Sequence, residues 1–197
     1  VTAISVGADA AKEAIRQALA MGADKGVLVK GDKGDAFQVA EMLAAAIKPL
    51  GADLVLMGKQ SIDFDGMEVA PMLSELLGLP AATVVVGLKI EGGKAIVEKE
   101  VEGGRETVEL TLPCIIAAQK GLNEPRYPSL PNIMKAKSKP IQEVAGAPSA
   151  AARTEIVSMT KPDKKRANKI VKISDGMTGA AAAQEVARML HEEAKVI

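Results

Sequence analysis

The first 86 residues of the chain alternate between two kinds of hydrophobic pattern. Four short apolar runs have the length and β-branched content of buried strands, and they span residues 1–6, 26–29, 53–57 and 82–86. Three longer stretches carry apolar residues at helical spacing, and they cover residues 9–21, 35–50 and 67–77. Strict alternation requires parallel strands joined by right-handed crossovers. The sequence therefore predicts an α/β fold with a doubly wound, mostly parallel sheet covered on both faces.

After Gly87 the pattern changes to short segments in which apolar and polar residues alternate. Two glycine pairs, Gly92-Gly93 and Gly103-Gly104, separate these segments, which indicates antiparallel hairpins. The expected strands cover residues 88–90, 95–101 and 107–112. We interpret their glutamate-rich side as a solvated face. An apolar strand over 113–118, which contains Cys114, then returns to the core.

Composition limits the possible function classes. The 197 residues are 48% apolar, which is enough for one good core and favours one domain with a tail over two domains. Lys plus Arg equals Asp plus Glu at 25 each, and the chain has one Tyr, two Phe and no Trp, which argues against a nucleic-acid binder. A single cysteine excludes an internal disulfide and fits a reducing compartment. Membrane spans need about 20 apolar residues, and no run approaches that length.

The residues used in common catalytic sites are scarce. The single histidine, His191, lies near the C-terminus, so a Ser-His-Asp or Cys-His site finds no support. One cysteine and one histidine also cannot supply a zinc-type ligand set. Neither the dinucleotide-binding glycine fingerprint nor the P-loop motif occurs. We therefore expect no catalytic residues and no metal site.

The loop after the strand at 53–57 is the candidate small-molecule site. It reads GKQSIDFDGMEV, leads into a helix, and follows the carboxyl end of a strand, where open α/β sheets bind nucleotides. The end of the first strand is expected beside it. Taken alone, such a loop is more often a plain connection. The predicted contact residues are Val6, Gly7, Gly58, Lys59, Gln60, Ser61, Ile62, Asp63, Phe64, Asp65, Gly66, Met67, Glu68 and Val69.

The segment 122–140, LNEPRYPSLPNIMKAKSKP, predicts a stiff loop. Its four prolines argue against a continuous helix or an interior strand. Apolar residues on an exposed loop suggest a docking surface, and the lysines that follow could steer an acidic partner. The alternative is a core-packing loop with a solvated basic end. The predicted docking residues are Leu130, Pro131, Ile133, Met134 and Lys135.

From Glu143 onward the chain loses core character. We expect a nucleotide-binding domain over 1–142 and a linker with a C-terminal arm over 143–197, in which the basic run 161–169 does not pack by itself. Residues 169–173 could form a strand, and 179–195 predict an amphipathic helix. An apolar stripe on a tethered helix needs a partner surface; folding back on its own domain is the alternative.

Several motifs carry a family resemblance. LNEPRYPSLPNIMKAK resembles the recognition loop of the small (beta) subunit of electron transfer flavoproteins, and VEKEVEGGRETVELTLPCIIA upstream is similar to a second signature of that family. GADLVLMGKQSID and HEEAKVI extend the likeness over nearly the whole chain. Family members begin with a strand, a hairpin-like excursion and an acidic helix before the strand that reads VTAISVG here. The chain starts at Val1, so we expect that opening segment to be absent from it, either because the chain is a fragment or because the first strand is supplied differently.

The resemblance implies an electron carrier with a Rossmann-like fold of the adenine nucleotide alpha hydrolase type. The small subunit would form a heterodimer with a large (alpha) subunit that holds most of the FAD. Electrons would pass from acyl-CoA dehydrogenases of fatty acid β-oxidation to electron transfer flavoprotein-quinone oxidoreductase. The implied location is the cytoplasm of a bacterium or the mitochondrial matrix of a eukaryote. The small subunit would supply the dehydrogenase-docking loop and a structural AMP site.

In the implied AMP site, Gly58 lets the adenine or ribose approach the backbone. The N–H groups of Met67, Glu68 and Val69 face the phosphate, and Asp63 and Asp65 suit ribose hydroxyls or helix capping. Many relatives place Asn, Gln, Thr or Ala-Gln-Val at 67–69, and a glutamate there disfavours phosphate unless it points away. Two alternatives remain open: a flavin-bifurcating relative with a second FAD in the same pocket and NADH as donor, or an adenine-nucleotide-hydrolase-type enzyme.

Overall fold

The computed structural model describes residues 1–31, 34–149, 151–162, 169–173 and 177–196. The chain divides into two compact units, Val1–Glu155 and Ile156–Ile197, and each is described by itself. The expected α/β class with mostly parallel strands is confirmed. Hydrogen bonding divides the strands of the first unit between two sheets, one of three strands and one of five.

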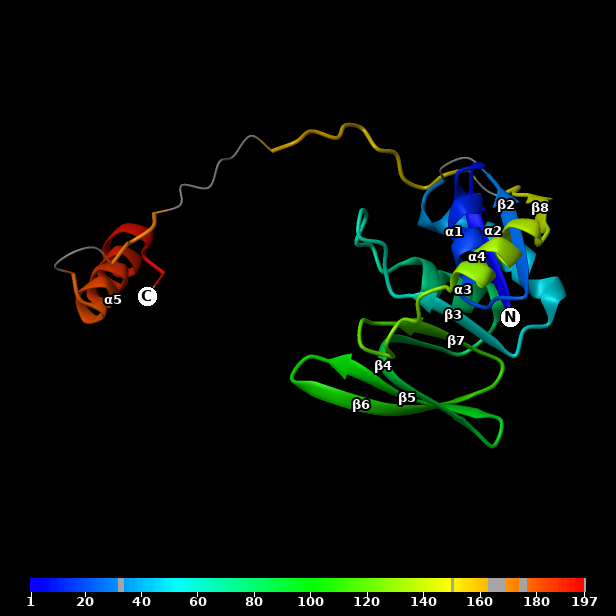
Figure 1. Ribbon diagram of the computed structural model, residues 1–197, viewed down its shortest axis with the longest axis horizontal. Helices are drawn as coiled ribbons and strands as arrows, with labels where there is room; N and C mark the ends of the chain where they lie inside the picture. Colours follow the sequence, from blue (N-terminus) through cyan, green and yellow to red (C-terminus); the bar gives the residue numbers. More distant parts are fainter. Residues whose placement is uncertain (32–33, 150, 163–168, 174–176, 197) are drawn as a thin grey trace. The chain divides into compact units, whose positions relative to one another are not determined.

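The three-stranded sheet has the order β1-β2-β8 and is parallel throughout. Its strands are β1 (Thr2–Gly7), β2 (Lys25–Lys30) and β8 (Ile141–Ala145). Helix α1 (Ala11–Ala20) packs on one face, and α2 (Ala36–Ile47), which continues as the 3-10 turn η1 (Lys48–Leu50), packs on the other (Figure 1).

Successive side chains of β2 point to opposite faces, which explains its continuous apolar run. Leu28 packs with Ile15 and Leu19 of α1. Val27 and Val29 pack with Met42 of α2 on the other side. A central strand with helices on both faces therefore needs apolar residues throughout its interior, and only the lysines at the two ends of β2 are exposed.

The five-stranded sheet has the order β3-β7-β4-β5-β6. Strands β3 (Leu54–Gly58), β7 (Cys114–Ala118) and β4 (Ala81–Glu91) are parallel neighbours. β4, β5 (Lys94–Val101) and β6 (Gly104–Thr111) form the antiparallel hairpins expected from the glycine pairs. The runs 82–86 and 88–90 belong to one strand with register shifts, near which Val84 has a left-handed φ of 58°.

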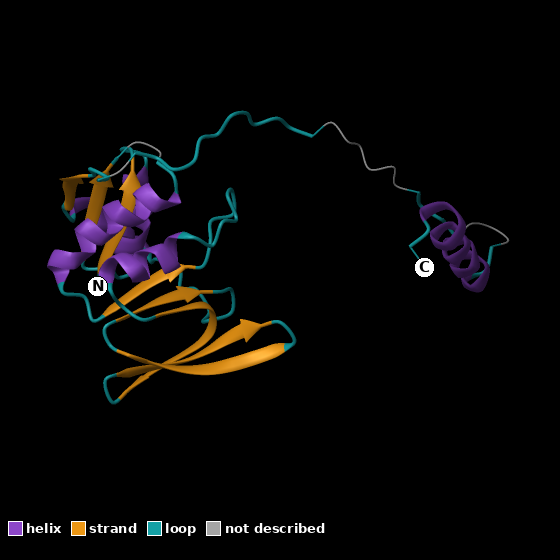
Figure 2. Ribbon diagram, turned by 180° about the vertical axis from the view of Figure 1, so that it is seen from behind, coloured by secondary structure: helices purple, strands orange, loops and turns teal. Residues whose placement is uncertain are grey.

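Helix α3 (Val69–Leu77) covers one face of the parallel part of this sheet, where Leu73 packs with Ile115. The neighbouring residues Cys114 and Ile116 point the other way and pack with Ala95, Val97 and Leu110 of the hairpin strands. The hairpin strands therefore supply the core on the side away from α3, and Figure 2 shows them lying apart from the helices.

As expected, no continuous helix spans 122–140, but the segment is not a loop throughout, because Leu130–Ser138 forms helix α4. Ser129 has the extended backbone of an N-cap, and Pro131 lies in the first turn, where its missing N–H costs nothing. The helix stops before Pro140, which cannot continue it. Two of the prolines thus bound the helix instead of preventing it.

The first unit extends beyond the boundary expected after residue 142, which falls inside β8. The N–H of Gly146 donates to the carbonyl of Lys30 at 2.5 Å. The N–H groups of Arg153 and Thr154 both donate to the carboxylate of Asp35, which also caps α2. The guanidinium of Arg153 lies 3.7 Å from the ring centroid of Phe37. These contacts hold the chain against α2 as far as Thr154.

The second unit contains α5 (Gly179–Arg188), which continues as the π-helical turn η2 (Met189–Ala194). The hydroxyl of Thr178 caps α5 by accepting the N–H of Ala181 at 3.2 Å. The suggested strand at 169–173 is not formed. Most of the basic run 161–169 lies outside the described residues. Within the described residues, no helix combines the length and apolar character that crossing a bilayer requires.

Candidate nucleotide and docking sites

A hollow of about 410 Å³ lies at the carboxyl ends of β3 and β7. The two strands are paired in parallel register, with Gly58 opposite Ala118, and the N–H of Lys59 donates to the Ala118 carbonyl at 3.0 Å. The loops that follow the two strands therefore start side by side. The hollow is lined by Gly58, Lys59, Gln60, Ile62, Asp65, Ala118, Gln119 and Lys120.

Five of the residues predicted for the nucleotide site line this hollow, namely Gly58, Lys59, Gln60, Ile62 and Asp65. The other predicted loop residues lie outside the lining, and all of them except the half-buried Val69 are exposed: Ser61, Asp63, Phe64, Gly66, Met67, Glu68 and Val69. Val6 and Gly7 end β1 in the three-stranded sheet and do not line the hollow. Their contribution to a nucleotide site stays a prediction.

Internal hydrogen bonds shape the loop beside the hollow. The side-chain amide of Gln60 donates to the carboxylate of Asp65, whose own N–H donates to the Ser61 carbonyl at 3.0 Å. Asp65 and Met67 adopt left-handed φ angles of 53° and 55°. Asp63 accepts the N–H of Phe64 at 3.1 Å. The side chain of Glu68, the N-cap residue of the following helix, makes no capping bond.

Helix α3 begins beside this loop and leaves few donors for an anion. Glu68 occupies the N-cap position, and the first helical N–H groups have no partner within the helix. Pro71 has no N–H, so the groups of Glu68, Val69 and Ala70 remain. The Glu68 side chain lies toward Gly66, where an added Cβ would meet its carboxyl carbon at 3.5 Å. Lys59 and Lys120 contribute positive charge to the hollow.

Helix α4 has one buried and one exposed side. Ala136 is 2% exposed and packs with Ile15 and Leu19 of α1. Leu130, Ile133 and Met134, which are 79%, 36% and 64% exposed, share one side at i, i+3 and i+4 spacing. We call these three residues the docking face. Pro131 and Lys135 are also exposed on this helix.

Comparisons with known proteins agree on one family. Residues 1–149 match the model of the electron transfer flavoprotein domain. The chain belongs to the electron transfer flavoprotein family. It is 39% identical to electron transfer flavoprotein subunit beta of Bacillus subtilis, over 100% of this chain and 79% of that protein. The beta subunits of Syntrophomonas wolfei (41%; 89% and 69% covered) and Homo sapiens (37%; 96% and 76% covered) are also similar. The resemblance to beta subunits is confirmed.

Sequence reasoning missed part of the hollow in this electron transfer flavoprotein chain. Ala118, Gln119 and Lys120, which lie at and after the end of β7, also line the hollow. The strand 113–118 was expected, but which strand it would pair with cannot be read from the sequence. A signal did exist, because the carboxyl ends of parallel strands meet at one edge of a sheet.

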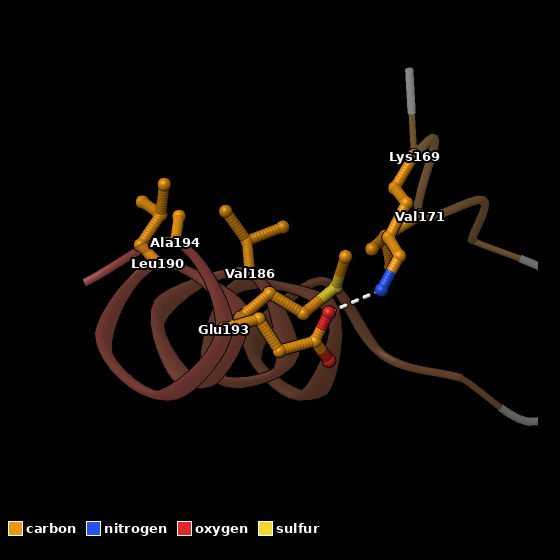
Figure 3. A pocket seen from close by; sticks show the side chains of 7 residues that line it. Lys169, Val171, Val186, Leu190, Glu193 and Ala194 are labelled. Atoms are coloured by element: carbon orange, nitrogen blue, oxygen red, sulfur yellow. Dashed lines mark hydrogen bonds and ion pairs between the residues drawn. The ribbon is translucent and has the colours of Figure 1, made fainter. Parts of the chain in front are cut away.

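The C-terminal unit of this family member contains a second hollow, of about 300 Å³, on α5 and η2 (Figure 3). Its lining is mainly apolar and consists of Lys169, Val171, Val186, Met189, Leu190, Glu193 and Ala194. The ammonium of Lys169 pairs with Glu193 at its rim. Arg188 bonds Glu185 at 2.7 Å and Glu192 at 2.8 Å. The hydrogen bond from Arg188 lowers the pKa of Glu185.

A cluster of charges connects β8 to α1 and to the end of β2. Lys12 lies 2.6 Å and Lys30 2.5 Å from the carboxylate of Glu143, and Lys12 lies 2.8 Å from Asp9. Hydrogen bonds from Lys12 lower the pKa values of Asp9 and Glu143 and in turn raise that of Lys12. Two acids and two bases neutralise one another here, so we assign the cluster to structure.

Within the ranges that the structure describes, no group of histidine, cysteine, aspartate and glutamate side chains could hold a metal ion. Cys114 is buried in the sheet, and this burial raises the pKa of its thiol. A raised pKa leaves little thiolate, so the group is a poor nucleophile.

Proposed function

We propose that this chain is the small subunit of an electron transfer flavoprotein that docks acyl-CoA dehydrogenases through α4. With a large subunit it carries electrons, by way of an FAD held mainly by that subunit, to electron transfer flavoprotein-quinone oxidoreductase. The observation that supports this most is Leu130, 79% exposed on a helix whose opposite side is buried. A large apolar side chain on a supported helix can enter a partner's pocket at little entropic cost.

Within this proposal, AMP occupies the hollow between the ends of β3 and β7. The volume of about 410 Å³ lies in the range of small-molecule sites. Gly58 allows the nucleoside to approach the backbone, and Lys59 and Lys120 carry charge opposite to a phosphate. The free N–H groups at the start of α3 add a favourable dipole. The subunit itself performs no substrate chemistry; the large subunit's FAD supplies the redox chemistry when bound.

The C-terminal unit is proposed to pack on the large subunit. Val186 and Leu190 are 43% and 38% exposed beside the apolar hollow of α5 and η2. An amphipathic helix with such a stripe gains free energy when a partner covers it. The expected compartment is the cytoplasm in a bacterium or the mitochondrial matrix in a eukaryote.

A flavin-bifurcating relative is the second candidate, with FAD in place of AMP and NADH as donor. The carboxylate of Glu68 at the start of α3 disfavours a phosphate of either nucleotide there, so this residue does not choose between AMP and FAD. The third candidate is an adenine-nucleotide hydrolase. It differs from the other two because this chain alone would have to turn over ATP.

The test is the nucleotide content of the heterodimer, measured by mass spectrometry after co-expression with the large subunit of the same source. One AMP and one FAD per heterodimer is the expected result. Two FAD molecules would favour bifurcation, and ATP turnover by the isolated chain would favour the hydrolase. Failure to form a heterodimer at all would overturn the proposal.

A further inference from the structure

The C-terminal end of α4 is held by a side chain from α1. The guanidinium of Arg16 donates from Nη1 to the carbonyl of Ala136 at 2.6 Å, and the same nitrogen bonds the carbonyl of Lys139. The last carbonyls of a helix have no partner within the helix and carry partial negative charge. The Ala136 carbonyl also accepts the N–H of Lys139 at 3.3 Å, so the guanidinium adds a second donor to it and interacts favourably with the helix dipole.

A second bond crosses in the opposite direction. The ammonium of Lys139, the residue after α4, donates to the carbonyl of Ala23, in the turn that follows α1, at 2.7 Å. Between the two bonds lies Ala136, whose small side chain lets the helices approach closely. A cationic side chain of α1 thus reaches carbonyls at the end of α4, and one from the residue after α4 reaches a carbonyl in the turn after α1.

Arg16 takes part in no ion pair with any carboxylate that the structure describes; the hydrogen bonds recorded for its side chain go to these carbonyls. Helix α4 has only nine residues, a length at which an isolated helix is unstable in water. Its order therefore depends on its contacts with α1. The contacts at its C-terminal end come from Arg16 and Lys139, and its N-terminal end begins with Leu130.

We propose that Arg16 is a positioning residue for the docking face of α4. By fixing the end of the helix, Arg16 keeps Leu130, Ile133 and Met134 in one orientation before any partner arrives. A surface ordered in advance loses less conformational entropy on association. Arg16 then affects how well a dehydrogenase binds and leaves the electron-transfer step unchanged. This inference rests on the proposed docking function.

The test compares Arg16→Gln with Lys12→Gln in the assembled heterodimer. Both changes remove one positive charge from α1, but Lys12 bonds Asp9 and Glu143 and makes no recorded bond to α4. Two quantities are measured: hydrogen exchange of the amides of residues 130–138, and KM and kcat for the flavoprotein in a dehydrogenase-coupled assay. Arg16→Gln should speed exchange in α4 and raise KM roughly three- to tenfold, with kcat and FAD content unchanged.

Arg16→Lys keeps the positive charge but loses the fork of guanidinium donors. Compared with Arg16→Gln, it should show slower hydrogen exchange in α4 and a lower KM. It also carries the same comparison if Arg16→Gln does not fold. Exchange and KM equal to those of Lys12→Gln would overturn the inference.

Leu130→Ala separates this inference from the docking function. A raised KM for Leu130→Ala together with an unchanged KM for Arg16→Gln defeats the role of Arg16 alone. Unchanged KM values for both variants defeat the docking function, and the positioning role with it.

Discussion

Leu130 and Ala136 belong to the same helix, yet the first side chain is 79% exposed and the second is 2% exposed. Leu130 is available for contact with a partner, whereas Ala136 contacts α1. The exposed side and the buried side of α4 can therefore be changed separately. Substitutions at these positions should therefore affect different measurements.

Leu130→Ala should weaken docking without loss of stability. Burying a leucine side chain is worth about 1.5 to 3 kcal/mol, which corresponds to one to two decades in affinity. We expect KM for the flavoprotein in a dehydrogenase-coupled assay to rise by a factor in that range, with an unchanged visible spectrum and Tm.

Ala136→Leu is the matched control on the same helix. Overpacking at this buried position should lower the free energy of unfolding by about 1 to 3 kcal/mol.

The docking prediction for Leu130 has its own contradicting outcome. If Leu130→Ala reduces electron transfer only in proportion to lost FAD, Leu130 serves the core and the docking face does not bind a dehydrogenase.

Glu68→Gln should preserve or increase the AMP retained by the heterodimer. The change removes a negative charge at the start of α3, where the phosphate is proposed to lie. Lys120→Ala, which removes a positive charge from the wall of the hollow, should decrease AMP while FAD content stays the same. Quantifying both nucleotides after denaturation checks this. A marked loss of AMP in Glu68→Gln would mean that Glu68 makes a needed hydrogen bond.

Removing residues 179–197 should abolish stable association with the large subunit and leave the first unit folded. The reason is the apolar hollow on α5 and η2, which a partner is proposed to cover. Size-exclusion chromatography measures co-elution, and circular dichroism measures the fold of the truncated chain. Co-elution at the level of the full chain contradicts the proposed packing of this unit.

The pH dependence of stability should contain a contribution from Asp35. The N–H of Gln38 first, and those of Arg153 and Thr154, hydrogen-bond its carboxylate and lower its pKa in the folded state. A folded pKa below the unfolded value of about 3.9 stabilises the protein above that pH. This stabilisation is lost as pH falls through the folded pKa.

Asp35→Asn should therefore have a lower free energy of unfolding than the unmodified protein at pH 7. The difference in free energy of unfolding should become smaller below about pH 4. Urea unfolding of both proteins at pH 7 and below about pH 4 measures this difference. A gap that is the same at both would show that the charge of Asp35 has no part in holding α2 and the segment after β8.

Gly146→Ala should destabilise the first unit, by about 1 to 3 kcal/mol. An added Cβ would lie 2.6 Å from the carbonyl oxygen of Lys30 and 2.6 Å from the sulfur of Met42. Gly179→Ala is the control, because nothing lies within 4 Å and alanine favours the first turn of α5. Equal effects on urea unfolding would contradict the packing of residue 146 against β2.

Sequence patterns predicted those helices and strands whose burial produces a hydrophobic pattern in neighbouring residues. β2 and β3 are short apolar runs, and the amphipathic helix beginning at Gly179 has clear spacing. β8 was missed because Gln142 and Glu143 interrupt its apolar pattern, as an edge strand allows. The segment of α4 was described as a stiff loop because of its number of prolines, whereas the position of a proline in a helix decides its effect.

The candidate site was predictable on one side only. The loop after β3 follows a general rule for open sheets, and four of its residues line the hollow together with Gly58 at the end of β3. The rest of the lining depends on β7 being the neighbour of β3, a long-range pairing that no local pattern records. The role of Arg16 was not predicted for the same reason, since its hydrogen-bond partners, Ala136 and Lys139, lie far along the chain.

The hydrogen bonds from Arg153 and Thr154 to Asp35 have a consequence for assembly. They fix the point at which the chain leaves the first unit, so the tether to α5 starts at Glu155 and not at residue 143. If both units bind the same large subunit, the contact made second is intramolecular, and a shorter tether raises its effective concentration. Two individually weak contacts can then hold the heterodimer together, and release requires both to open at once.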